Sequence, residues 1–126
     1  MSKYLTAESI LQSDDFVFAE VECPEWGGTV RIRSMSGAQR ATLKKAVNNG
    51  TETADEMICV MCIVDDDGNR IFNSNQIELL RKKNTNAITR VAKRALQISG
   101  LIDVKQAVEE AEKNSEETES GDSSFD

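Results

Sequence analysis

The sequence predicts an α+β fold that is mainly α, with an N-terminal β-hairpin packed on a small bundle of about four to five helices. Residues 16–34 alternate apolar and polar side chains around a turn rich in Pro and Gly, which is typical of a hairpin. Residues 36–102 repeat apolar side chains at helical spacing between capping signals. Residues 114–126 are Asn, Glu, Ser, Asp, Thr and Gly with a single Phe, so we expect a disordered acidic tail.

Length and charge narrow the class of protein. A chain of 126 residues fits one domain, here residues 1–102, and excludes a large multi-domain enzyme. Residues 103–126 hold nine of the 22 acids and two of the 15 bases, so the net charge of −7 lies entirely there. An acidic tail repels nucleic acid and membrane surfaces, which argues against both as partners.

The cysteines and the absence of histidine exclude several kinds of site. Cys23, Cys59 and Cys62 form an odd set, without a secretory segment or a membrane span, so we expect a reduced protein in the cytoplasm. No histidine is present, which removes the commonest general base and metal ligand.

The N-terminal elements follow from capping and alternation. Residues 6–13 predict a short capped helix, and residues 16–23 and 29–34 predict the two strands. Matching apolar with apolar and acid with base predicts a strand register that pairs Cys23 with Val30, Val21 with Ile32, Glu22 with Arg31 and Glu20 with Arg33.

The helices follow from caps and from apolar periodicity. Ser36 with Gln39 predicts a helix that ends at Asn49–Gly50, with Leu43, Ala46 and Val47 on one face. Thr53 with Glu56 predicts the next helix, which is apolar nearly all round through Val64 and should be the buried central element.

Further along, residues 65–69 predict a turn and residues 70–72 a short extended piece. Ser74 predicts the start of a helix that carries Ile77, Leu79 and Leu80. The longest periodic run follows Asn84 and stops at Ser99–Gly100, with a buried stripe of Ile88, Val91, Ala92, Ala95 and Leu96. Residues 103–113 predict one more, weakly amphipathic helix, with Val104, Ala107, Val108 and Ala111 on one side.

No catalytic, metal or cofactor site is predicted. Cys59–Cys62 forms a lone CxxC in the middle of an apolar helix, where burial should raise the thiol pKa values. Structural zinc needs four ligands, and three thiols without histidine do not supply them. Asp65–Gly68 resembles part of a calcium loop but lacks the bidentate Glu, so a tight turn is the better interpretation.

Two features leave alternatives open. The basic helix pair at residues 76–98 resembles a helix-turn-helix, which keeps a small DNA-binding regulatory protein as an alternative function. Trp26, at the expected hairpin tip, either anchors a partner or folds back over the helices. A thiol or metal protein is the third class, and it would show bound zinc or a reactive thiol.

An ordered set of short motifs resembles one known family. The set comprises Pro24–Val30, Arg33, Ser36–Gly37, Arg40, Asp65–Phe72, Ile77, Leu80, the Ala87–Leu96 run and Ser99–Leu101. Together these motifs resemble the tail assembly chaperones of long-tailed bacteriophages, and the Ser/Asp/Glu-rich end is similar in style. The chain departs from the pattern at Gln76, where such sequences often carry an acid.

The resemblance implies a late, non-enzymatic protein of phage assembly. Such a chaperone binds the tape measure protein, assists polymerisation of the tail tube protein around it, and is absent from the virion. It implies the cytoplasm of an infected bacterial host, or of a lysogen, and, in many such phages, a longer frameshifted form. Apart from the resemblance, another copy of the chain is kept as a candidate partner. For the partner surface we single out Trp26, Val104, Ala107, Val108 and Ala111, on the hypothesis that residues 77–111 contact the partner.

Overall fold

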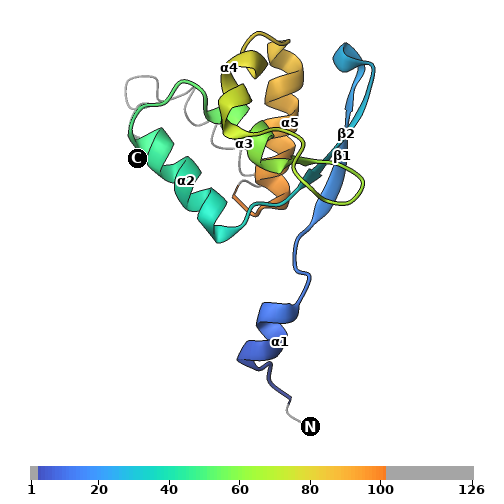
Figure 1. Ribbon diagram of the computed structural model, residues 1–126, viewed down its shortest axis with the longest axis vertical. Helices are drawn as coiled ribbons and strands as arrows, with labels where there is room; N and C mark the ends of the chain where they lie inside the picture. Colours follow the sequence, from blue (N-terminus) through green and yellow to red (C-terminus); the bar gives the residue numbers. More distant parts are fainter. Residues whose placement is uncertain (1–2, 102–126) are drawn as a thin grey trace, which may run out of the picture.

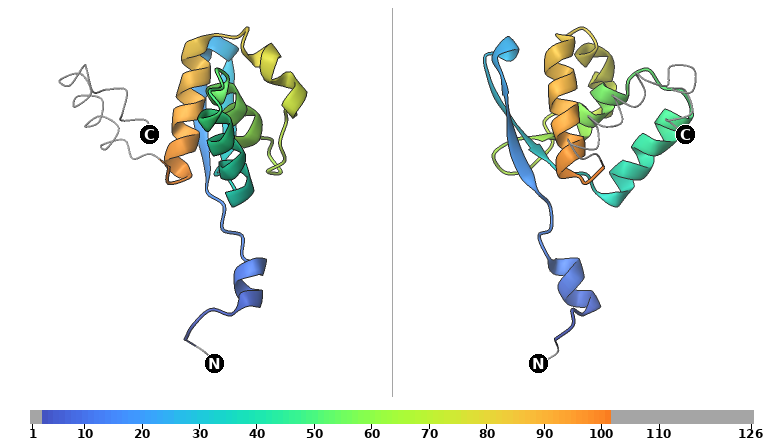
Figure 2. Two further views of the ribbon diagram at one scale, coloured as in Figure 1. Left: turned by 90° about the vertical axis from the view of Figure 1, so that its left-hand side faces the viewer. Right: turned by 180° about the vertical axis from the view of Figure 1, so that it is seen from behind.

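The computed structural model describes residues 3–101 and confirms the α+β, mainly α architecture. A three-stranded antiparallel sheet forms one layer, and α3 (Ala54–Cys62) and α5 (Thr85–Ile98) pack beside it (Figures 1 and 2). Next to α3 on its other sides lie α2 (Gly37–Asn48) and the short α4 (Ile77–Leu80). The residues expected to form the 103–113 helix and the 114–126 tail lie outside the described part of the chain.

The hairpin consists of β1 (Phe18–Cys23) and β2 (Gly28–Arg33), and its expected register is wrong by two residues. Val21 faces Val30 instead of Ile32, and Cys23 faces Gly28 instead of Val30. A slip of two residues leaves every side chain on its own face of the sheet, so alternation cannot detect it. The turn sets the register, because the 3-10 turn Pro24–Trp26 and Gly27, at φ +78°, close the hairpin within four residues.

A third strand was not expected. The central helix ends at Cys62 instead of continuing, and β3 (Ile63–Val64) pairs antiparallel with Ile32 and Arg31 of β2. Side chains from other segments satisfy carbonyls that the end of a helix leaves without partners. Arg70 Nε donates to the Val60 oxygen at 3.1 Å, and Gln39 Nε2 donates to the Met61 oxygen at 3.2 Å.

Local signals placed some helix starts correctly and missed others. Ser36 and Gln39 form the expected capping box of α2. Thr53 makes no capping bond to α3, because its hydroxyl pairs with that of Thr51 at 3.0 Å. The chain enters α4 through a 3-10 turn, Ser74–Gln76, that Asn73 begins in place of Ser74; Asn73 N–H donates to Gln76 Oε1 at 2.9 Å.

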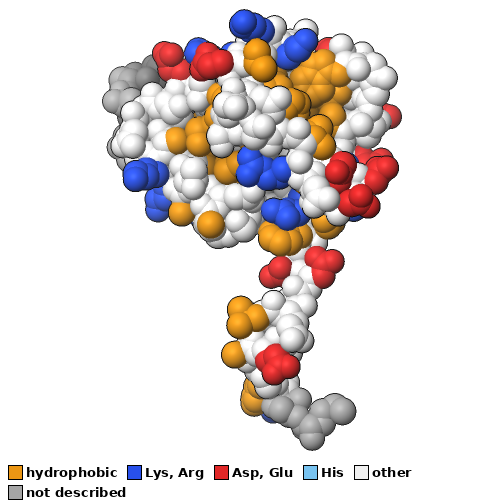
Figure 3. Space-filling view, in the orientation of Figure 1, with side chains coloured by type: hydrophobic (Ala, Val, Ile, Leu, Met, Phe, Trp, Pro, Cys, Tyr) orange, Lys and Arg blue, Asp and Glu red, His pale blue; other side chains and the backbone are white. Residues whose placement is uncertain are grey.

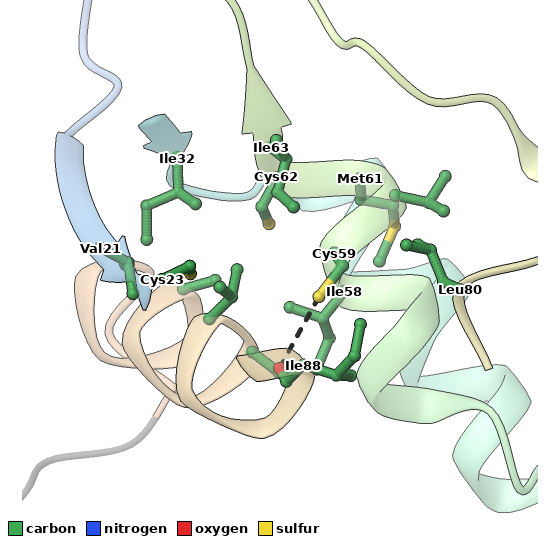
Figure 4. Packing of buried hydrophobic residues seen from close by; sticks show 14 of the residues in the cluster. Val21, Cys23, Ile32, Ile58, Cys59, Met61, Cys62, Ile63, Leu80 and Ile88 are labelled. Atoms are coloured by element: carbon green, nitrogen blue, oxygen red, sulfur yellow. Dashed lines mark hydrogen bonds between the residues drawn. The ribbon is translucent and has the colours of Figure 1, made fainter. Parts of the chain in front are cut away.

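The core lies between the sheet, α3 and α5, as Figure 4 shows. Every residue from Ile58 to Cys62 is buried, which confirms α3 as the central element. The α5 stripe is also confirmed, with Ala87 buried in addition and Leu96 half-buried. Val47, expected on the inner face of α2, is 51% exposed. No helix in the described part of the chain is long and apolar enough to cross a membrane.

The N-terminal helix α1 (Ala7–Gln12) forms as expected but stands away from the body at the end of an extended segment (Figure 1). Thr6 and Ser9 cap it reciprocally, and none of its side chains is buried. Leu5 and Leu11 are 77% and 83% exposed. Helices this short are marginal in isolation, so α1 presents an apolar surface without stabilising the core.

Candidate functional site at the hairpin tip

An ion pair fixes the hairpin tip to α5. Arg90 donates from both terminal guanidinium nitrogens to the two carboxylate oxygens of Glu25, each at 2.8 Å. The same guanidinium also donates to the Glu22 carbonyl at 3.3 Å. Two parallel bonds fix orientation as well as distance, so the 3-10 turn that carries Trp26 is held in place.

The ion pair also changes the electrostatics of the tip. Hydrogen bonds from Arg90 lower the pKa of Glu25 from 4.5 to about 2. The carboxylate is therefore charged and neutralised by its partner at any physiological pH. In effect, the tip presents an apolar surface next to a paired charge.

Beside the tip lies an open apolar groove of about 480 Å³. Its apolar lining comes from three segments that are distant in sequence: Trp26 from the hairpin tip, Phe72 from the loop after β3, and Leu79 and Leu80 from α4. Glu25, Gln76 and Lys83 complete the rim. We refer to this feature as the tip groove.

The loop between β3 and α4 brings Phe72 and α4 to the hairpin tip. Asp65 Oδ1 accepts from the N–H groups of Asp67 and Asn69 at 2.9 and 3.0 Å, which closes the expected turn. The chain then returns past Arg70, which forms a bridge with Val64, and Asn73 starts the turn into α4. Leu80 is buried against the core, whereas the adjacent Leu79 is 56% exposed at the groove.

The tip groove has a basic neighbourhood. Lys82 and Lys83 lie just beyond Arg81, the residue that follows α4; both lysines are exposed, and neither has an ion-pair partner among residues 3–101. Figure 3 shows hydrophobic side chains gathered at the end of the molecule where α4 and the hairpin tip lie, next to Lys and Arg side chains. The site therefore combines an apolar floor with uncompensated positive charge.

Of the residues singled out from sequence, the structure places Trp26 at this site. Trp26 is half-buried: it folds back against the core and also lines the tip groove, so the two expected alternatives are combined. Val104, Ala107, Val108 and Ala111 lie outside the described residues. Sequence reasoning missed the contribution of Phe72 and Leu79. One signal in the sequence could have indicated Leu79: two adjacent residues of a helix do not point to the same face, so of Leu79 and Leu80 one must lie away from the core.

The thiols are buried and protonated. Burial raises the pKa of Cys59 to about 12 and that of Cys62 to about 11, as expected. The Cys59 thiol donates to the Ile88 carbonyl at 3.7 Å, the dashed contact in Figure 4. Among the described residues, no group of three or more acidic or thiol side chains is arranged to hold a metal ion. These thiols serve as packing groups, because a thiol with such a pKa is a poor nucleophile at neutral pH.

Several charged and polar side chains of the basic helix pair already bind partners within the fold. Arg90 binds Glu25, and Arg81 lies 3.5 Å from Glu78 and 3.8 Å from Glu52. Asn84, a candidate base reader, accepts from two backbone N–H groups at the start of α5. This geometry gives the DNA-binding alternative no support.

Comparison with known proteins identifies the fold. No family model and no curated protein matches the chain. Among solved structures, the tail assembly chaperone of bacteriophage HK97 is similar, with a TM-score of 0.60 and 23% sequence identity. The alignment covers 76% of this chain and 95% of that one. The two proteins therefore share a fold, the one that the sequence motifs implied.

Proposed function

We propose that this chain is a non-enzymatic tail assembly chaperone of a long-tailed bacteriophage. The observation that carries the proposal is the fold shared with the HK97 tail assembly chaperone across 95% of that chain. Agreement between this fold and the independent motif resemblance supports a common role. The protein would act in the cytoplasm of the infected host, or of a lysogen, and leave before the virion is complete.

The proposed principal partner is the tape measure protein, with the tail tube protein and a second copy of the chain as further partners. A long helical rod with apolar stripes needs apolar surface to cover it until the tube surrounds it. The tip groove, the exposed Leu11 of α1 and the exposed Leu5 just before that helix supply such surface. Trp26 is the proposed aromatic anchor, as tryptophans are enriched among residues that dominate binding energy.

A second contact is proposed along Val104, Ala107, Val108 and Ala111. In a helix their spacing would put them on one face, and the sequence pattern is too weakly apolar for a core helix. If deletion of residues 103–126 leaves partner binding unchanged, this second contact does not exist.

The test is capture of the N-terminally tagged chain from phage-infected cells, with partners identified by mass spectrometry. We expect a very large helical tape measure protein and tail tube subunits among the captured partners.

The groove variant Leu79→Asp tests the binding surface. It places a charge in the tip groove, and we expect capture of the tape measure protein to fall about tenfold or more, since ~1.4 kcal/mol changes an equilibrium tenfold. Val47→Asp is the matched control, because Val47 is 51% exposed on α2, away from the groove. Nucleic acid, or no tail protein at all, among the captured partners would contradict the proposal.

A further inference from the structure

We propose that the tip groove binds a segment of this same chain, Phe125 with its flanking acids Asp122 and Asp126. The contact would form within an isolated chain, so it is independent of the tail proteins proposed above. A partner that enters the groove would have to displace Phe125.

The groove has the chemistry to hold an aromatic side chain flanked by acids. Trp26, Phe72 and Leu79 leave an open apolar surface that no described residue covers. Glu25, the acidic group on the rim, is neutralised by Arg90 at 2.8 Å. Lys82 and Lys83 are unpaired within residues 3–101. A ligand that matches these features carries one apolar group between negative charges.

The distal acidic tail contains one such group. Between residues 114 and 126 there are Glu, Asp and small polar residues, and Phe125 is the single large apolar side chain. The net charge of residues 103–126 equals that of the whole protein, −7, so the segment is attracted to the lysines beside the groove. Aromatic pairs with Trp26 or Phe72 would add to the burial of the ring.

The intervening chain is long enough. The last described residue, Leu101, follows the C-terminal end of α5, and α4 and the hairpin tip lie near its N-terminal end (Figure 1). A helix of the length of α5, 14 residues, spans about 21 Å. As an unstructured chain, 24 residues would have an r.m.s. span of about 27 Å. With residues 103–113 helical, that helix would span about 16 Å and the twelve residues up to Phe125 would extend up to about 40 Å. In either case Phe125 would reach the groove at a high effective concentration.

The α1 segment of the same chain does not lie in the groove. Val17 and Ser34 exchange hydrogen bonds at 2.9 and 2.8 Å, which anchors the chain at the base of the hairpin. The six residues of β1 place the tip about 20 Å from that base. In the structure α1 stands away from the body, at the end of the hairpin opposite the tip, and none of its residues lines the tip groove (Figure 1).

Trp26 provides the test, because it is the single tryptophan of the chain and lines the groove. We would measure the emission maximum and acrylamide quenching of the full-length protein. Phe125→Ser should shift the emission to the red and increase quenching. Val47→Ser, which removes an exposed apolar side chain of α2 away from the groove, should change neither property.

Charge reversal tests whether the lysines beside the groove attract the acids that flank Phe125. Lys82→Glu with Lys83→Glu should produce the same red shift as Phe125→Ser, and adding Asp122→Lys with Asp126→Lys should restore the original emission. The control pair Lys44→Glu with Lys45→Glu, on exposed positions of α2, should have no effect.

Two results would overturn the proposal. One is an emission spectrum of Phe125→Ser that matches the unmodified protein. The other is a shift that appears only as protein concentration rises, because the groove would then be filled by a segment of a second copy.

Discussion

Arg90 is the residue that connects the hairpin to the helical layer. From the sequence it belongs to a solvated basic face of α5, together with Lys93 and Arg94. In the structure it binds both carboxylate oxygens of Glu25 and the Glu22 carbonyl. Because Glu25 and Trp26 are neighbours in one 3-10 turn, the ion pair sets where the indole lies.

The Glu25 pKa gives the tip a defined pH dependence. The folded value, about 2, lies below the ordinary value of 4.5, so the ion pair stabilises the tip fully above pH 4.5 and is lost as pH falls toward 2. We expect the Trp26 emission of the unmodified protein to change across this interval. Glu25→Gln should remove that part of the change, whereas Glu22→Gln should retain it. Identical titrations of the two variants would show that the ion pair does not position Trp26.

At the scale of elements, α4 is a single helical turn with one inward and one outward leucine. Leu80 is 5% exposed in the core, and Leu79 is 56% exposed at the tip groove. Leu80→Ala should lower the free energy of unfolding by about 2–5 kcal/mol, the usual cost of truncating a buried leucine. Leu79→Ala should lower it by about 0.5 kcal/mol or less. Urea denaturation measures both, and equal costs would mean that α4 is oriented differently.

Elements whose signals are local could be predicted from the sequence. The capping box of Ser36 with Gln39 and the apolar stripe of α5 involve neighbours within one helix, and both are present. β3 could not be predicted, because Ile63 and Val64 fit the apolar pattern of α3 equally well. What ends the helix is tertiary: Arg70 and Gln39 bind the last carbonyls, and β2 offers a free edge. The hairpin register depends in the same way on the turn.

At the scale of the whole molecule, the candidate site is only partly visible in the sequence. The hairpin tip of Trp26 could be located from alternation and turn residues. Phe72 and Leu79 join it only because the chain after β3 returns to α4 beside the tip, and no spacing rule connects residues that far apart. The family resemblance depends on an ordered series of short motifs, and the shared fold with the HK97 chaperone agrees with it.

The proposed function of this chain is to keep a long apolar helical partner soluble during tail assembly. The most direct measurement is the soluble fraction of the tape measure protein from the same phage when it is expressed with and without this chain. We expect the tape measure protein to aggregate alone and to remain soluble, bound to this chain, when co-expressed. Leu79→Asp should reduce the soluble fraction and Val47→Asp should not. A tape measure protein that is equally soluble in both cases, with no complex formed, would contradict the account.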